Sequence, residues 1–349
     1  MGISVLKGGA LTTVQDRGRV GYQDLGFSEA GAMDRRAFRL ANLLLGNAEN
    51  EAVLEVTMIG PEFVFRSDNC FVVTGADLGA RLNLLPIEVN RVYAAKAGDV
   101  VRFQKTFPAP GTGLRSYIGF AGGLDVPVLM GSRSTYCRGK LGGLEGRGLR
   151  TGDVIEFSAP KGTLGNLSLR AQRESFAEVY GGREITLRVI PGPQDDCFTE
   201  AGTETFYAGT YKVTDKSDRM GCRLDGPLIA HAKAADIVSD GIAYGAVQVP
   251  KEGKPIIMMA DRQSTGGYTK IANVITVDMP KLAQAQPGTK VHFQAVGVEE
   301  AQNLLLEEEK EYRALKERLE REWTTAERYG TPAYPDHRSL MRNLYGYRD

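Results

Sequence analysis

Histidine and cysteine are both scarce in this chain of 349 residues, and neither is spaced to form a metal site. The three histidines, His231, His292 and His337, are far apart, and His292 lies inside a predicted strand. The four cysteines are scattered and contain no CxxC pair, which favours free thiols in a reducing cytoplasm over disulfides or zinc ligation. The sequence therefore predicts no metal.

The chain also lacks net charge, because 43 lysines and arginines balance 43 aspartates and glutamates. Such a balance gives no basic excess for binding nucleic acid or an anionic membrane surface. Residues 1–8 have no secretory apolar core, and no apolar run approaches the roughly 18 residues of a membrane helix. We therefore expect a cytoplasmic protein without nucleic-acid or membrane partners.

Glycine is abundant, with 42 residues, and short alternating apolar runs separated by glycine and proline turns recur along the chain. This pattern predicts a mainly β protein. Asp34 precedes a helical pattern that ends before residues 46–47, so it is either a helix N-cap or a residue that faces a ligand. Residues 299–327 contain no glycine or proline and predict a long amphipathic helix. Its apolar stripe, expected to pack on the protein or a partner, consists of Leu305, Tyr312, Leu315, Leu319 and Trp323.

The most chemically varied stretch follows an apolar run at residues 255–259, which predicts a buried strand. Residues 260–270 then bring together a carboxylate, a guanidinium, an amide, hydroxyls, a phenol and an amine. Gly266 and Gly267 allow the backbone to approach a ligand closely. The alternatives are a hairpin turn with incidental polar residues, or a structural ion pair between Arg262 and a carboxylate such as Asp261.

Part of this stretch has a counterpart earlier in the chain. Residues 127–136 and 255–265 each begin with proline, continue through aliphatic residues and methionine, and reach arginine followed by serine and threonine. Each is followed by a turn and a predicted strand, at residues 151–157 and 287–293. This similarity predicts two related β modules in tandem, with these segments superposing.

Several longer motifs resemble one known family. They are TTVQDRGRVGY (residues 12–22), GAMD (31–34), GGLDVP (122–127), GSRST (131–135) and ADRQSTGGY (260–268). The resemblance is to the allophanate hydrolase subunit 2 family, also called the biotin-dependent carboxyltransferase family, and covers roughly residues 3–296. Thr269 departs from the family pattern, in which proline is expected, so a looser local turn is expected.

The resemblance implies two cyclophilin-like β-barrel modules. Changes in composition along the chain favour the following division into domains. The expected parts are a first module at residues 1–160, a linker at 161–184, a second module at 185–297, and a C-terminal helix and tail at 298–349.

The resemblance also implies an activity. The chain is similar to the C component of the three-component 5-oxoprolinase, a hydrolase that converts 5-oxoproline to L-glutamate with ATP. Its partners would be the A component and the Kip-inhibitor-like B component of the same enzyme. Because the chain has no recognisable ATP motif and no nucleophile paired with a base, we expect it to be inactive alone.

The implied site follows the motifs. Arg262 and Lys270 are expected to act in catalysis by neutralising charge. The residues expected to bind a small amide or lactam substrate are Asp261, Gln263, Thr265, Gly266, Gly267, Tyr268, Asp16, Arg19, Tyr22 and Asp34.

Two other functions occur in the family. The chain could be a regulatory antagonist that binds a Kip-type kinase inhibitor without catalysis. It could instead be the carboxyltransferase component of a biotin-dependent urea carboxylase or allophanate hydrolase-like system. The chain has no Met-Lys-Met biotin-carrier motif, so biotin would then come from a separate protein.

Overall fold

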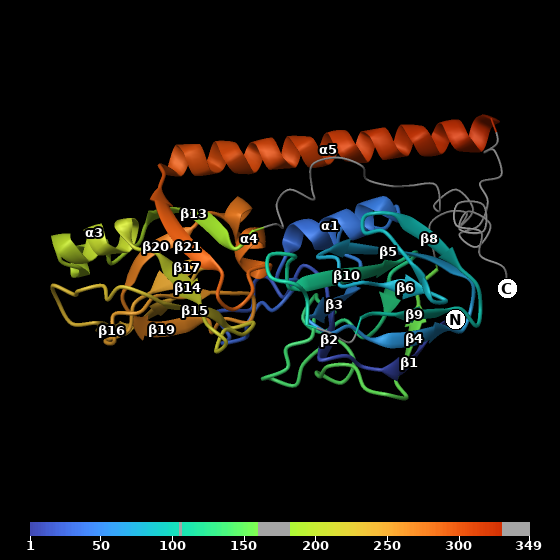
Figure 1. Ribbon diagram of the computed structural model, residues 1–349, viewed down its shortest axis with the longest axis horizontal. Helices are drawn as coiled ribbons and strands as arrows, with labels where there is room; N and C mark the ends of the chain where they lie inside the picture. Colours follow the sequence, from blue (N-terminus) through green and yellow to red (C-terminus); the bar gives the residue numbers. More distant parts are fainter. Residues whose placement is uncertain (105–106, 160–181, 330–349) are drawn as a thin grey trace.

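The computed structural model describes residues 1–104, 107–159 and 182–329. Two mainly β modules lie side by side, and the long helix α5 (Val298–Tyr329) runs along one side of both (Figure 1). The prediction of a mainly β protein with a C-terminal helix is confirmed. The predicted linker, residues 161–184, lies almost entirely outside the described residues, as does the tail beyond α5.

In the described part of the first module, the strands form two sheets. The larger sheet has the strand order β11 (Leu124–Asp125), β12 (Val154–Phe157), β1 (Gly2–Lys7), β4 (Glu62–Phe65), β9 (Val100–Arg102), β6 (Arg81–Leu82) and β7 (Leu85–Pro86). The other sheet has the order β2 (Leu11–Gln15), β3 (Val53–Thr57), β10 (Arg115–Phe120), β5 (Asn69–Gly75) and β8 (Val92–Ala95).

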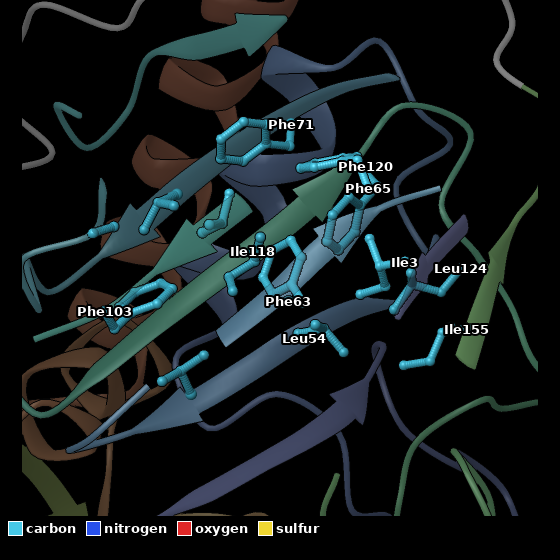
Figure 2. Close-up of a cluster of buried hydrophobic side chains, with 14 of the residues drawn as sticks. Ile3, Leu54, Phe63, Phe65, Phe71, Phe103, Ile118, Phe120, Leu124 and Ile155 are labelled. Atoms are coloured by element: carbon cyan, nitrogen blue, oxygen red, sulfur yellow. The ribbon is translucent and has the colours of Figure 1, made fainter. Parts of the chain in front are cut away.

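The core of this module lies between its two sheets. Figure 2 shows Phe63, Phe65 and Phe120 turned toward one another, with Ile3 from the larger sheet and Ile118 from the smaller one beside them. The Phe63 ring lies edge-on to Phe65 and Phe120, with centroids 5.7 and 5.9 Å away. Burying each such side chain contributes about 1.5–3 kcal/mol, so the inward residues of both sheets hold the module together.

The second module contains a closed barrel. Its strand order is β13 (Glu184–Pro191), β20 (Lys270–Val274), β17 (Ala246–Gln248), β18 (Ile256–Met258), β15 (Gly221–Asp225), β14 (Tyr211–Val213) and β21 (Lys290–Ala295). An outer ribbon pairs β16 (Asp236–Gly241) with β19 (Thr265–Tyr268). The short helices are η2 (Asp195–Cys197), α3 (Glu200–Ala208), η3 (Thr276–Asp278) and α4 (Met279–Ala283).

The predicted equivalence of residues 127–136 and 255–265 is wrong. Residues 256–258 form β18, a strand of the closed barrel, whereas residues 128–130 form an exposed loop with Val128 54% exposed. Within that loop, Leu129 and Ser132 form an isolated bridge. Apolar composition alone did not distinguish a barrel strand from a loop, because both segments carry similar side chains.

Helix α1 (Arg35–Leu44) packs against the smaller sheet of the first module, and α5 adds to the same apolar cluster. Asp34 is the N-cap of α1, as predicted, and its carboxylate accepts from the Ala37 amide. The predicted α5 stripe is docked on the chain's own first module through Tyr312, Leu315 and Leu319, all buried. No helix among the described residues is long and apolar enough to cross a membrane.

A polar contact fixes α5 in register with α1. The Tyr312 hydroxyl donates to the Arg39 carbonyl at 2.7 Å, and the Arg39 guanidinium lies 3.8 Å from the centre of the Tyr312 ring. Tyr312→Phe should lower the free energy of unfolding by about 1 kcal/mol, because it removes the hydrogen bond and keeps the ring. Urea denaturation would measure this, with Tyr136→Phe as a control; an unchanged midpoint would remove this hydrogen bond from the docking.

A buried ion-pair network joins the two modules. Arg219, in the loop between β14 and β15, donates to Asp261 at 2.9 and 3.1 Å, to the Gly31 carbonyl at 2.6 Å, and to Glu55 on β3. Burial lowers the pKa of Arg219, but the carboxylates of Asp261 and Glu55 raise it above its ordinary value overall. The other oxygen of Glu55 accepts from the Tyr117 hydroxyl at 2.9 Å. The modules therefore meet through charges withdrawn from water.

Candidate functional site

A cleft of about 760 Å³ opens on the second module beside β15, β17 and β18. Met220, Leu224, Ile256 and Met258 supply its apolar lining, with Leu224 and Met258 fully buried. Its polar lining includes two amides and a phenol, from Gln248, Gln263 and Tyr268. The cleft thus combines an apolar wall with many polar and charged groups, and converging polar groups beside an apolar wall can fix the orientation of a small ligand.

Gln248 is the most unusual of these residues. It ends β17, where Val247 faces the barrel core and Gln248 faces the cleft, because successive side chains of a strand alternate. Its side chain is only 3% exposed, yet its Nε2 has no hydrogen-bond partner among the described residues. A buried amide without a partner costs about 1–3 kcal/mol. Its Nε2 lies just beneath the surface of the cleft, so a ligand would reach this unsatisfied donor after a shift of the side chain.

A second amide lies beside the first. A Cβ on Gly266 would lie 2.8 Å from Gln263 Nε2 and 2.9 Å from Gln248 Nε2, so both amides approach the bare backbone of β19. Only glycine leaves room for them. Each amide has donor and acceptor groups in one plane, so the pair can match the planar N–H and C=O of another amide.

Charged residues surround the opening of the cleft. Lys254 and Asp225 form an ion pair at 2.6 Å, and Asp218 accepts from the Met220 and Gly221 amides. The side chains of Lys216 and Arg223 also line the cleft, and neither has an ion-pair partner in the described part of the chain. These two cations could bind a carboxylate on a ligand whose amide enters the cleft.

The structure brings some of the predicted residues to this cleft. Gln263 and Tyr268 line it, and Gly266 packs against its two amides. Thr265 and Gly267 lie on the same strand, β19, but do not belong to the lining. The motif at residues 260–268 therefore contributes one wall of the cleft.

The two predicted catalytic cations lie outside that lining. Arg262 is buried and donates to Glu29 at 2.8 Å and to the Ile242 carbonyl at 3.0 Å. Lys270 is buried and pairs with Asp240 at 2.8 Å, and this hydrogen bond lowers the pKa of the Asp240 carboxylate. Both cations thus hold segments that flank the cleft.

The other predicted carboxylates also have structural partners. Asp261 binds Arg219 in the module junction. Asp16 is fully buried and accepts from the Ser132 and Ser134 hydroxyls and the Arg133 amide. These partners belong to the loop after β11, so Asp16 folds that loop onto the N-terminal segment.

The remaining predicted residues are also absent from the cleft lining. Arg19 donates to the Ser134 carbonyl, and Tyr22 lies in the turn that follows. Asp34 caps α1 and also accepts from Gln284 at 2.8 Å, which connects the two modules. Residues 31–34 therefore lie at the module junction, whereas Asp16 and Arg19 hold the loop after β11. The predicted role of the N-terminal signature in substrate binding stays a prediction.

Thr269 is held firmly, in contrast to the expected loose turn. It is fully buried, and its amide donates to the Ala235 carbonyl at 3.0 Å. Proline has no amide hydrogen and could not make this bond.

Two residues of importance were not predicted from the sequence, Gln248 and Arg219. A polar residue that ends a short apolar strand was the available signal for Gln248. No signal in the sequence indicated Arg219, because its partners, Glu55 and Asp261, are distant along the chain.

The sequence and the fold match known proteins. The chain is 38% identical over 320 residues to the C component of the 5-oxoprolinase of Escherichia coli (strain K12), covering 92% of this chain and 99% of that protein. It is 35% identical over 302 residues to the C component of the 5-oxoprolinase of Haemophilus influenzae, covering 86% and 94%.

A solved structure shares the fold. The crystal structure of the Kluyveromyces lactis urea carboxylase superposes with a TM-score of 0.81 and 29% identity, over 90% of this chain and 29% of that one. Residues 25–295 match the model of the carboxyltransferase domain, subdomain A and B. The chain belongs to this carboxyltransferase domain family.

Proposed function

We propose that this chain is the C component of an ATP-dependent 5-oxoprolinase and opens 5-oxoproline to L-glutamate only together with the A and B components. The observation that carries the proposal is the 38% identity to the corresponding Escherichia coli protein over almost the whole of both chains. The cleft supports it, because 5-oxoproline contains the two groups that the cleft can bind, a planar lactam and a carboxylate.

The chemistry requires activation of an unreactive amide. Transfer of the γ-phosphoryl group of ATP to the lactam oxygen releases ADP and makes the ring carbon electrophilic. Water then adds to that carbon and the C–N bond breaks, which leaves the open chain as an acyl phosphate. A second water hydrolyses the acyl phosphate and releases glutamate and phosphate. The chain carries no phosphate-binding motif, so we assign ATP binding to the partner components.

In this proposal the chain positions the lactam. Gln248 and Gln263 hydrogen-bond its amide edge, Tyr268 covers its flat face, and Lys216 and Arg223 attract its carboxylate. Arg262 and Lys270 act indirectly, because they fix the residues on either side of this wall. The Gln248 donor has no protein partner among the described residues that a ligand would have to displace.

A second function is favoured by one specific observation. The similarity to a urea carboxylase structure covers 90% of this chain, and urea is also a small planar amide that could pair with Gln248 and Gln263. A carboxyltransferase role would require carboxybiotin delivered by a separate protein, with its carboxyl group transferred to the amide nitrogen.

Reconstitution separates the two functions. The purified chain alone should release no glutamate from 5-oxoproline, because it lacks the means to activate the lactam. Adding the A and B components with ATP should restore glutamate and ADP formation in equal amounts. Turnover of 5-oxoproline by the single chain would contradict the requirement for partners. The second function would be favoured if the chain carboxylated urea when a biotin carboxylase and a carboxybiotin carrier were added, and cleaved no 5-oxoproline.

A further inference from the structure

A second cavity, of about 340 Å³, lies where α1, α5 and the second module meet. Its apolar walls come from Phe38 on α1, Leu305 on α5, and Tyr244, Met279 and Pro280 of the second module. Helix α5 and α4 lie on the same side of the molecule as α1 (Figure 1). This cavity shares no lining residue with the cleft that contains Gln248.

Four arginines and three glutamates also line this cavity, so the arginines outnumber the glutamates. Arg39 is satisfied by both oxygens of Glu309, at 2.5 and 2.9 Å. Arg36 lies 3.6 Å from Glu308 and 3.7 Å from Glu311. Burial raises the pKa of Glu308, and the nearby guanidinium groups of Arg36 and Arg39 oppose this shift.

The other two arginines are poorly neutralised. Arg17 has no ion-pair partner in the described part of the chain. Arg35 makes one contact of 3.7 Å, with Glu29 Oε2, and that oxygen already accepts from Arg262 at 2.8 Å. Two guanidinium groups are therefore available to a bound anion.

Arg35 is also fixed in orientation. Its guanidinium lies 4.7 Å from the centre of the Tyr244 ring, and the Tyr244 hydroxyl donates to the Met33 carbonyl at 3.0 Å. A guanidinium stacked on an anchored ring keeps its planar donors directed one way and loses little freedom on binding.

Apolar walls with arginines at one side suit a ligand that has an apolar body and a negatively charged group. We propose that this cavity is a second ligand site, which binds a small organic anion, a carboxylate or a phosphate monoester, through Arg17 and Arg35. One wall is α5, which begins after the last residue of the family match, residue 295. A ligand here would bridge α5 and both modules, as expected of an effector site separate from the cleft.

Calorimetric titration with three aromatic probes tests this site. Benzoate and phenyl phosphate should both bind the full chain, whereas benzamide, which has the same ring without the charge, should bind at least about tenfold more weakly. The stronger of the two anions identifies which charged group the site prefers. No binding of either anion to the wild-type chain would overturn the proposal.

Two variants locate the binding. Arg17→Gln and Arg35→Gln should each weaken binding of the anions by at least about tenfold, because each removes a charge-assisted contact. Arg66→Gln removes an exposed arginine that pairs with Glu156 outside the cavity, and it should leave binding unchanged. Equal weakening of anion binding in all three variants would indicate attraction by overall charge and would overturn the site. Anion affinity equal to that of the wild-type chain in all three variants would also overturn it. Melting temperatures would verify that each variant is folded.

Discussion

Arg219→Met should lower the free energy of unfolding by about 3–5 kcal/mol, the effect expected when a buried ion pair loses one partner. The Arg219 guanidinium is 7% exposed and serves two carboxylates at once, Glu55 from the first module and Asp261 from the second. Without it, both carboxylates stay buried with their main counter-charge gone. Urea denaturation followed by circular dichroism would measure the loss as a lower midpoint.

Two further variants separate charge loss from other effects. Arg223→Met lies nearby on β15 but is exposed, so its stability should change by no more than about 0.5 kcal/mol. Combining Arg219→Met with Glu55→Gln and Asp261→Asn should recover part of the loss, because no unpaired charge stays buried. If Arg219→Met alone costs less than about 1 kcal/mol, then the network does not hold the modules together.

Features set by neighbouring residues were predictable from the sequence. The cap of α1 depends on Asp34 and an amide three residues later, so it is visible in a short window. Strand β18 follows from one uninterrupted apolar run. Neither strand of the β16–β19 ribbon was predicted, because the residues of β16 are nearly all exposed without apolar alternation and β19 contains two glycines.

The candidate site was predictable only in part. Gln263 and Tyr268 belong to the motif that attracted attention, and both line the cleft. Arg262 belongs to the same motif, but it is buried and directed to Glu29, whereas Gln263 next to it is exposed. Adjacent residues can thus serve opposite sides of one segment, and composition alone does not say which side faces a ligand.

Gln248 shows the other limit of the sequence. Gln248 approaches Gly266 because β17 pairs with β20 in the barrel, and β20 directly follows β19 along the chain. The spacing of residues in the sequence does not show that contact. The signature residues at 31–34 make contacts that join the modules, and their predicted role in substrate binding stays a prediction. A conspicuous motif therefore did not show whether its residues bind a ligand or join the two modules.

Gln248→Leu should lower the activity of the assembled enzyme by about 10- to 100-fold, or roughly 1.4–2.7 kcal/mol of transition-state stabilisation. The reason is that Gln248 Nε2 is a buried donor without a protein partner among the described residues, placed where a lactam amide can accept its hydrogen bond. The same change should leave the stability of the free chain unchanged or raise it by about 1–3 kcal/mol, because an unsatisfied amide is replaced by an apolar group of similar size. Activity measured as glutamate release with the A and B components, and stability measured by urea denaturation, should thus change in opposite directions.

Gln284→Leu provides the matched control for that result. Gln284 is also a buried glutamine, 4% exposed, but its amide donates to Asp34 and to the Arg115 carbonyl and accepts from the Leu114 and Arg115 amides. Its replacement leaves those groups unpaired, so stability should fall by several kcal/mol, with activity lost only as the chain unfolds. If Gln248→Leu behaves like Gln284→Leu, then Gln248 is a structural residue. If it keeps full activity, then the lactam does not bind in this cleft.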